Sequence, residues 1–226
     1  MTFIRHQLRH AALTIGSALA LGCTGVTIND GDPTSDASTC PAEPGAVSLA
    51  FSNGSVASKS NCLGIAGQLW SSSDGHSTIT PRFAGSTACI QGQVAQVVGK
   101  DYDTYWGVVA GLNLNQPPNS AAKAYDAATH GLSGFQLELS GTEQPASTRM
   151  RIQLQDTQDG FYCQAGVTSA ARDYQLAAFH EDCWTTTPGR APPPSSLLSV
   201  ALMITAQEAA PLPFDVCFTL AGLHTD

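Results

Sequence analysis

The chain has 226 residues, 42% of them hydrophobic, and its ten Lys and Arg against 18 Asp and Glu give a net charge of −8. This length is enough for one domain with a substantial core. The sequence has no basic cluster after its first ten residues, which excludes nucleic acid and anionic membrane surfaces as principal ligands.

Residues 1–22 have the pattern of a signal peptide of the lipoprotein type. Basic residues precede an apolar run over residues 11–21, which is too short to span a bilayer, because spanning takes about 20 helical residues. The run ends just before Cys23 and resembles the lipobox of bacterial lipoproteins. The resemblance implies acylation of Cys23 and anchoring at the cell envelope, for which we predict the outer membrane. Ala20 stands where lipoboxes usually have leucine, so cleavage by ordinary signal peptidase and secretion is the alternative.

Residues 23–45 have the composition of a flexible acidic tether. They are rich in Thr, Asn, Asp, Gly, Ser and Pro and bury too little apolar surface to order themselves. The run from Asn29 to Asp36 contains groups that calcium prefers, but it lacks the spacing and the final glutamate of an EF-hand. We therefore predict a linker and no calcium loop in this segment.

The cysteines predict an oxidising compartment. Apart from Cys23 they form an even set of six, which predicts three disulfides with the connectivity left open. None of the spacings is C-x-x-C, so we expect no zinc site and no redox motif. The six disulfide candidates are Cys40, Cys62, Cys89, Cys163, Cys183 and Cys217.

Residues 46–226 read as one all-β domain. Short runs of β-forming residues recur between clusters of Gly, Pro, Asn and Ser, and only residues 120–129 look helical. This pattern predicts a two-sheet antiparallel sandwich of the jelly-roll type. The expected strands are 47–52, 87–98, 105–115, 134–140, 148–155, 160–167, 174–183, 197–206 and 214–221.

The strand expected over residues 105–115 has two different faces. Trp106 shares one phase with valine, alanine and leucine, which predicts a place in the core. The other phase holds Tyr105, Asn113 and Asn115, with two glycines between the ring and the amides. Apolar faces of sugars stack on aromatic rings and amides bind hydroxyl groups. We therefore expect Tyr105, Asn113 and Asn115 to line a binding groove.

Polar side chains on neighbouring strands are expected to complete this groove. Gln136 and Glu138 alternate with apolar residues of one strand, and Arg151 does so in the next. Amide and guanidinium groups form planar, directional hydrogen bonds suited to hydroxyl recognition. Tyr102 precedes the strand at 105–115 and is expected at the rim.

The domain resembles the galactose-binding-like jelly rolls that include many bacterial carbohydrate-binding modules. The resemblance implies a non-catalytic domain that binds glycans in the groove of one sheet, often with a structural calcium, for which we assign no ligands here. We expect no other cofactor. The segments that carry the resemblance are residues 89–95, 103–107, 111–115 and 134–140, with Tyr162-Cys163 and Asp182-Cys183-Trp184.

Catalytic signatures are missing from the sequence. It contains no Gly-x-Ser-x-Gly, no His-Glu-x-x-His, no P-loop and no Rossmann glycine pattern. His180 and Glu181 would point to opposite faces of a strand. We therefore predict a carbohydrate-binding protein that is not an enzyme. The alternatives are a structural or adhesive envelope lipoprotein that binds another protein, and a glycoside hydrolase using two of Glu138, Glu143 and Glu181.

Overall fold

The computed structural model describes residues 43–84, 87–183, 185 and 189–225. The predictions for the signal peptide, for acylation of Cys23 and for Cys40 lie outside the described residues, and the domain boundaries stay predictions. Within the described ranges, no helix is long and apolar enough to cross a membrane.

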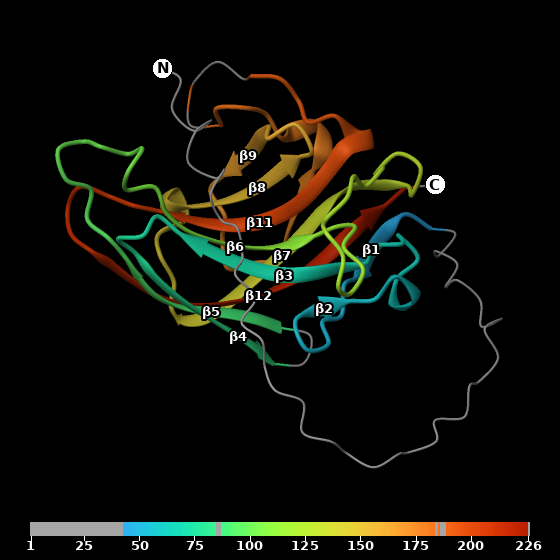
Figure 1. Cartoon of the computed structure of the whole chain (residues 1–226), viewed down its shortest axis with the longest axis horizontal. Coiled ribbons are helices and arrows are strands. Elements are labelled where there is room, and N and C mark those ends of the chain that lie inside the picture. The colour runs from blue at the N-terminus through green and yellow to red at the C-terminus, as the bar shows by residue number, and fades with distance from the viewer. Residues whose placement is uncertain (1–42, 85–86, 184, 186–188, 226) are drawn as a thin grey trace, which may run out of the picture.

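The strands form two antiparallel sheets that pack face to face (Figure 1). We name each sheet after its most central long strand. The β12 sheet has the order β10-β7-β12-β5-β4, and β1 also pairs with β12. It consists of β1 (Gly45–Ser48), β4 (Thr78–Ala84), β5 (Thr87–Val94), β7 (Leu132–Glu143), β10 (Arg172–Gln175) and β12 (Leu212–His224).

The β6 sheet has the order β2-β3-β6-β11-β8-β9. The connections include short 3₁₀ helices at Ser58–Ser60 (η2), Ser147–Arg149 (η3), Leu176–Ala178 (η4) and Pro194–Ser196 (η5). The strands of this sheet are β2 (Ser55–Val56), β3 (Gly67–Ser73), β6 (Gly107–Asn113), β8 (Met150–Asp156), β9 (Phe161–Ala165) and β11 (Leu197–Thr205).

Alternation along the strands builds the core between the sheets. In β6 the core residues are Val108, Ala110 and Leu112, and in β12 they include Phe214 and Val216. Because successive side chains in a strand point to opposite faces, the residues between them face away from the core. The predicted fold class, an all-β two-sheet antiparallel jelly-roll sandwich, is confirmed.

Several element predictions were wrong for local physical reasons. Residues 120–129, expected to be helical, form turns and one isolated bridge at Tyr125. In place of the strand expected over 174–183, the short strand β10 ends at Gln175, because the chain then forms η4 and a turn. β3 was missed because its serines lack β propensity. β4 was missed because it contains Pro81, which an edge strand tolerates.

Two of the predicted disulfides are confirmed, one in each sheet. Cys89 in β5 is bonded to Cys217, its registered neighbour in β12. Cys163 in β9 is bonded to Cys183, which ties the following loop to the edge of the β6 sheet. Cys62 is also disulfide-bonded.

Candidate functional site

Three rows of side chains cross the outer face of the β6 sheet, and we call them together the β6 face. The middle row follows from strand register, because residues paired across neighbouring strands point to the same side. Gly111 pairs with both Trp70 and Ala201, and Ala201 pairs with Gln153. Gln153 in turn pairs with Cys163.

The flanking rows lie two residues away along each strand. One contains Ser72, Val109, Met203, Arg151 and Ala165, and the other contains Asn113, Ser199, Gln155 and Phe161. In β6, β8 and β11 the residues that alternate with these rows belong to the core cluster, so all three rows face away from the core.

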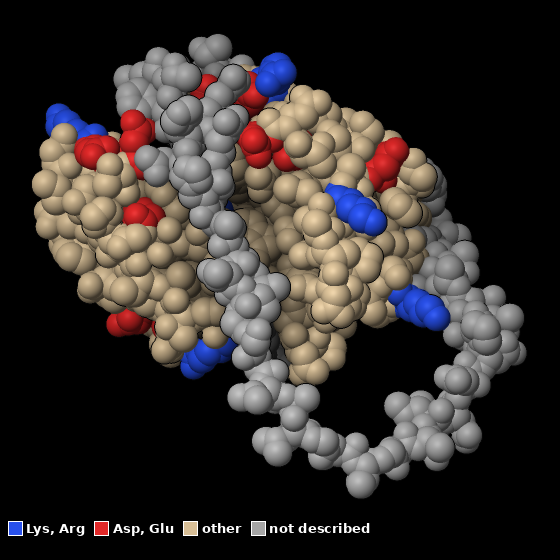
Figure 2. All heavy atoms as spheres, in the orientation of Figure 1, with Lys and Arg blue, Asp and Glu red and all other residues tan. Residues whose placement is uncertain are grey.

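The floor of the β6 face is made of small side chains. Val109, Ala201 and Ser199 are only 4%, 6% and 2% exposed, although they point away from the core. Figure 2 shows this side of the molecule, with raised groups of described residues to the left and right of its middle. A low floor with taller residues on either side is the shape expected of a binding groove.

Trp70 supplies the aromatic surface of this face. Its indole ring lies against Gly111: a Cβ added to Gly111 would come within 3.0 Å of Trp70 Cζ2 and 2.6 Å of the Ala201 Cβ. Only glycine at position 111 therefore leaves room for the indole ring to pack against the sheet. The ring is half-buried. Among the described residues, its indole nitrogen has no hydrogen-bond partner.

Arg151 brings a positive charge to the same face. It is half-buried, and desolvation together with the nearby charge of Arg149 lowers the pKa of its guanidinium to about 10. The group therefore stays protonated at neutral pH. Arg149 donates a hydrogen bond from Nη1 to the Ala206 carbonyl oxygen over 3.5 Å. The predicted site residue Arg151 thus belongs to the β6 face.

Asn113 and Asn115 have structural partners at one end of the β6 face. The Asn113 amide donates to Gln116 Oε1 over 2.6 Å, and the Gln116 amide donates to the Ser120 carbonyl oxygen. Asn115 donates to the Ala124 carbonyl oxygen over 2.7 Å. The two asparagines therefore hold the loop that follows β6, and Asn113 also belongs to a row of the face.

The predicted places of Tyr105 and Trp106 are wrong. Tyr105 packs against the core and its ring stacks on His76, with ring centroids 4.4 Å apart. Trp106 is half-buried and lies outside the core cluster of the described residues. The cause is Gly107, whose φ of +113° interrupts the alternation. The aromatic ring over the middle row of the β6 face is Trp70, which was not predicted because its strand β3 was not predicted.

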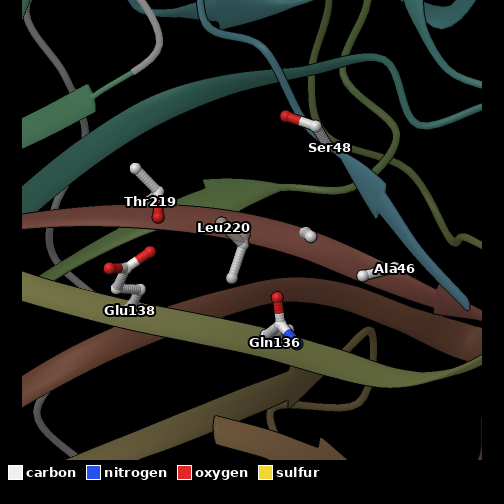
Figure 3. A pocket seen from close by; sticks show the side chains of 7 residues that line it. Ala46, Ser48, Gln136, Glu138, Thr219 and Leu220 are labelled. Atoms are coloured by element: carbon white, nitrogen blue, oxygen red, sulfur yellow. The ribbon is translucent and has the colours of Figure 1, made fainter. Parts of the chain in front are cut away.

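Gln136 and Glu138 lie on the opposite side of the molecule from the β6 face. They belong to β7 in the β12 sheet and point into a shallow hollow of about 230 Å³ beside β12 and β1 (Figure 3). Gln136 donates to Asp173 Oδ1 over 2.8 Å. The prediction that they complete a groove with Asn113 was wrong, because alternation within a strand does not reveal which sheet the strand joins.

Tyr102 lies in the loop before β6 and is 47% exposed. Its hydroxyl donates to Glu208 Oε1 over 2.7 Å, and this bond is the main reason that the pKa of Tyr102 is raised. It therefore joins the loop before β6 to the loop after β11. Its predicted role at the rim of a ligand site stays a prediction.

The carboxylates considered for hydrolysis lie apart in the fold. Glu138 and Glu143 are in β7 of the β12 sheet, whereas Glu181 follows η4 beside β9 and pairs with Arg190 over 2.7 Å. His180 forms an isolated bridge with Cys163 and a turn begins at Glu181, so the two residues do not share a strand as predicted. Among the described residues, no three His, Cys, Asp or Glu gather as they would around a metal ion.

No protein-family model matches the chain, and no curated protein matches its sequence. Among solved structures it is similar to a family 11 carbohydrate-binding module from Clostridium thermocellum in complex with a β-1,3-1,4-mixed-linked tetrasaccharide. Identity is 7% and the TM-score 0.42, over 70% of this chain and 88% of the module.

An exo-β-agarase is also similar, with 9% identity and a TM-score of 0.39 over 69% of this chain. A second agarase gives 14% identity and a TM-score of 0.37 over 70% of this chain. This chain spans 23% and 22% of the two agarases' lengths. The module is of the class that the sequence resemblance named.

Proposed function

We propose that the protein is a non-catalytic, extracytoplasmic carbohydrate-binding protein and that the β6 face is its binding surface. The observation that carries the proposal is the ring of Trp70, which lies on Gly111 in the middle of a polar face. Sugar rings present apolar C–H faces that pack on aromatic rings, while their hydroxyl groups need hydrogen-bond partners. Trp70 supplies the ring, and Gln153, Gln155 and Ser72 supply polar groups around it.

The low floor of the face supports a groove that holds an extended chain. Val109, Gly111 and Ala201 leave room between Trp70 on β3 and Gln153 on β8. A preformed concave surface with few ordered polar groups binds with little loss of conformational entropy. The ligand would run across the strands, from β3 towards β8.

Replacement of the ring tests the proposal. In affinity electrophoresis we test the polysaccharides that retard the wild type. We expect Trp70→Ala to bind them at least tenfold more weakly, a loss of about 1.4 kcal/mol in binding free energy. Gln136→Ala, in the hollow of the β12 sheet, is the matched control and should bind like the wild type. Equal retention of wild type and Trp70→Ala, with loss in Gln136→Ala, would move the site to the other sheet.

The extracytoplasmic location rests on separate features. Disulfides such as Cys89–Cys217 and Cys163–Cys183 persist in oxidising compartments. Acylation of Cys23 would then hold the protein at a membrane surface. Metabolic labelling with a fatty acid should mark the wild type and not Cys23→Ser. Unlabelled wild type recovered from the medium would favour secretion.

A further inference from the structure

Two arginines differ in exposure from all other cationic side chains in the described part of the chain. Arg149 and Arg151 are half-buried. The remaining six are exposed, and two of these form ion pairs, Arg82 with Asp215 and Arg190 with Glu181. The exposed six are Lys59, Arg82, Lys100, Lys123, Arg172 and Arg190. Partial burial puts both guanidinium groups in drier surroundings than those of the six exposed cations.

The two arginines lie at the β8 side of the groove. Arg151 is in β8, in the row next to that of Trp70 and Gly111, and Arg149 is two residues earlier at the end of η3. Between β3 and β8 lie β6 and β11, so the backbones that carry Trp70 and Arg151 are about 14 Å apart. This separation requires a ligand longer than one sugar ring if it is to contact both side chains.

The chemistry of a guanidinium in this setting favours a carboxylate. Its planar fork matches the two oxygens of a carboxylate, and the resulting hydrogen bonds are stronger than those to a neutral hydroxyl. Charges that are partly removed from water also attract each other more strongly. The overall charge of −8 opposes an anionic ligand only weakly at this site, because physiological salt screens exposed charges beyond about 8 Å.

We propose that the ligand of the β6 face is an acidic polysaccharide whose uronate carboxylates bind Arg151, with a sugar ring of the same chain on Trp70. This inference rests on the proposed function, since it names the ligand class of the same face. Arg149 adds a second positive charge beside Arg151 and favours a chain with repeated carboxylates. Gln153, in the same row as Trp70 and next to the row of Arg151, binds hydroxyl groups of the sugar that bridges the two contacts.

Carboxyl reduction provides the direct test, because it removes the charge and keeps the glycan backbone. The probes are polygalacturonate and alginate, each beside its carboxyl-reduced form, with binding measured by affinity electrophoresis and calorimetry. We expect the wild type to bind at least one uronate polymer tenfold or more tightly than its reduced form. In Arg151→Gln this preference should disappear, whereas Arg151→Lys should keep part of it.

Arg172→Gln is the matched control, because Arg172 is exposed in β10 of the β12 sheet. It should keep the preference of the wild type, and thermal unfolding checks that each variant is folded. Equal binding of the charged and reduced polymers would overturn the uronate assignment and leave the proposed function standing. Retention by a sulfated carrageenan alone would also overturn it. A folded wild type that binds no polysaccharide of either kind would refute the proposed function as well.

Discussion

The two outer faces of the sandwich differ in how their polar side chains are used. On the β12 sheet, exposed polar groups bind one another, as Gln136 does with Asp173 and as Arg82 and Thr142 do with Asp215. On the β6 face, Trp70 and Arg151 are half-buried above a floor of small residues. Any sandwich needs polar outer faces, so polarity alone identifies no site. The feature that distinguishes the β6 face is the partial burial of Trp70 and Arg151 beside a floor of small side chains.

Each sheet has one disulfide, and removing the two in turn should have the largest and most different effects on stability and on binding. Cys89–Cys217 spans 128 residues, and its removal by alanine at both positions should lower the free energy of unfolding by about 4 to 5 kcal/mol. Cys163–Cys183 spans 20 residues and should cost about 3 kcal/mol. Urea unfolding measures both losses.

Binding should respond to the two disulfides in the opposite order. Cys163 ends the middle row of the β6 face, so loss of its bond frees the adjoining loop and should weaken glycan binding several-fold. Loss of Cys89–Cys217, measured at a temperature where the variant is folded, should leave affinity unchanged. Weaker binding in the Cys89–Cys217 variant alone would contradict the placement of the site on the β6 face.

Gly111→Ala tests whether the sheet is built around the Trp70 ring. The added methyl group would lie 2.7 Å from the Val200 carbonyl oxygen and 2.6 Å from the Ala201 Cβ. We expect a loss of about 1 to 3 kcal/mol in the free energy of unfolding, with weaker glycan binding because the ring is displaced.

Gly45→Ala is the matched control for this substitution. A Cβ at Gly45 in β1 meets only the Glu43 carbonyl oxygen, at 4.0 Å. Its effect should stay within about 0.5 kcal/mol. If the two alanine variants have equal stability and affinity, the packing of Trp70 on Gly111 is not what shapes the face.

Arg151→Met should give the smallest effect on stability. An apolar chain of similar length on the outer face of β8 should change the free energy of unfolding by less than about 1 kcal/mol, while binding to uronate polymers is lost. Arg172→Met, on the exposed edge strand β10, should change stability by less than about 0.5 kcal/mol. A destabilised Arg151→Met would show that Arg151 serves the fold.

The sandwich and one row of the candidate face could be predicted from the sequence, because alternation is a local property. The phases of Val108 to Leu112 in β6 and of Met150 to Leu154 in β8 were predicted correctly, and they put Arg151 on an outer face. Gly107 with its positive φ reversed the phase just before β6, so Tyr105 packs against the core and Trp106 lies outside the core cluster.

The rest depends on contacts between distant segments. Whether β7 or β11 lies beside β6 is decided by packing of whole strands, so Gln136 and Glu138 were assigned to the wrong face. Trp70 lies among serines that carry no strand signal of their own, and β3 forms because β6 pairs with it. The feature that could have pointed to Trp70 is Gly111, since a strand glycine often marks a close approach by another group.

The indole nitrogen of Trp70 reports directly on whether the ligand binds the β6 face. Its N–H has no partner among the described residues and gives a separate signal in a ¹H–¹⁵N NMR spectrum, which Trp70→Phe would assign. On titration with oligogalacturonates, and in parallel with their carboxyl-reduced forms, we predict that this signal shifts together with the backbone amides of Gln153 and Arg151. Shifts confined to Gln136, Glu138 and Thr219 around the hollow of the β12 sheet would contradict the account.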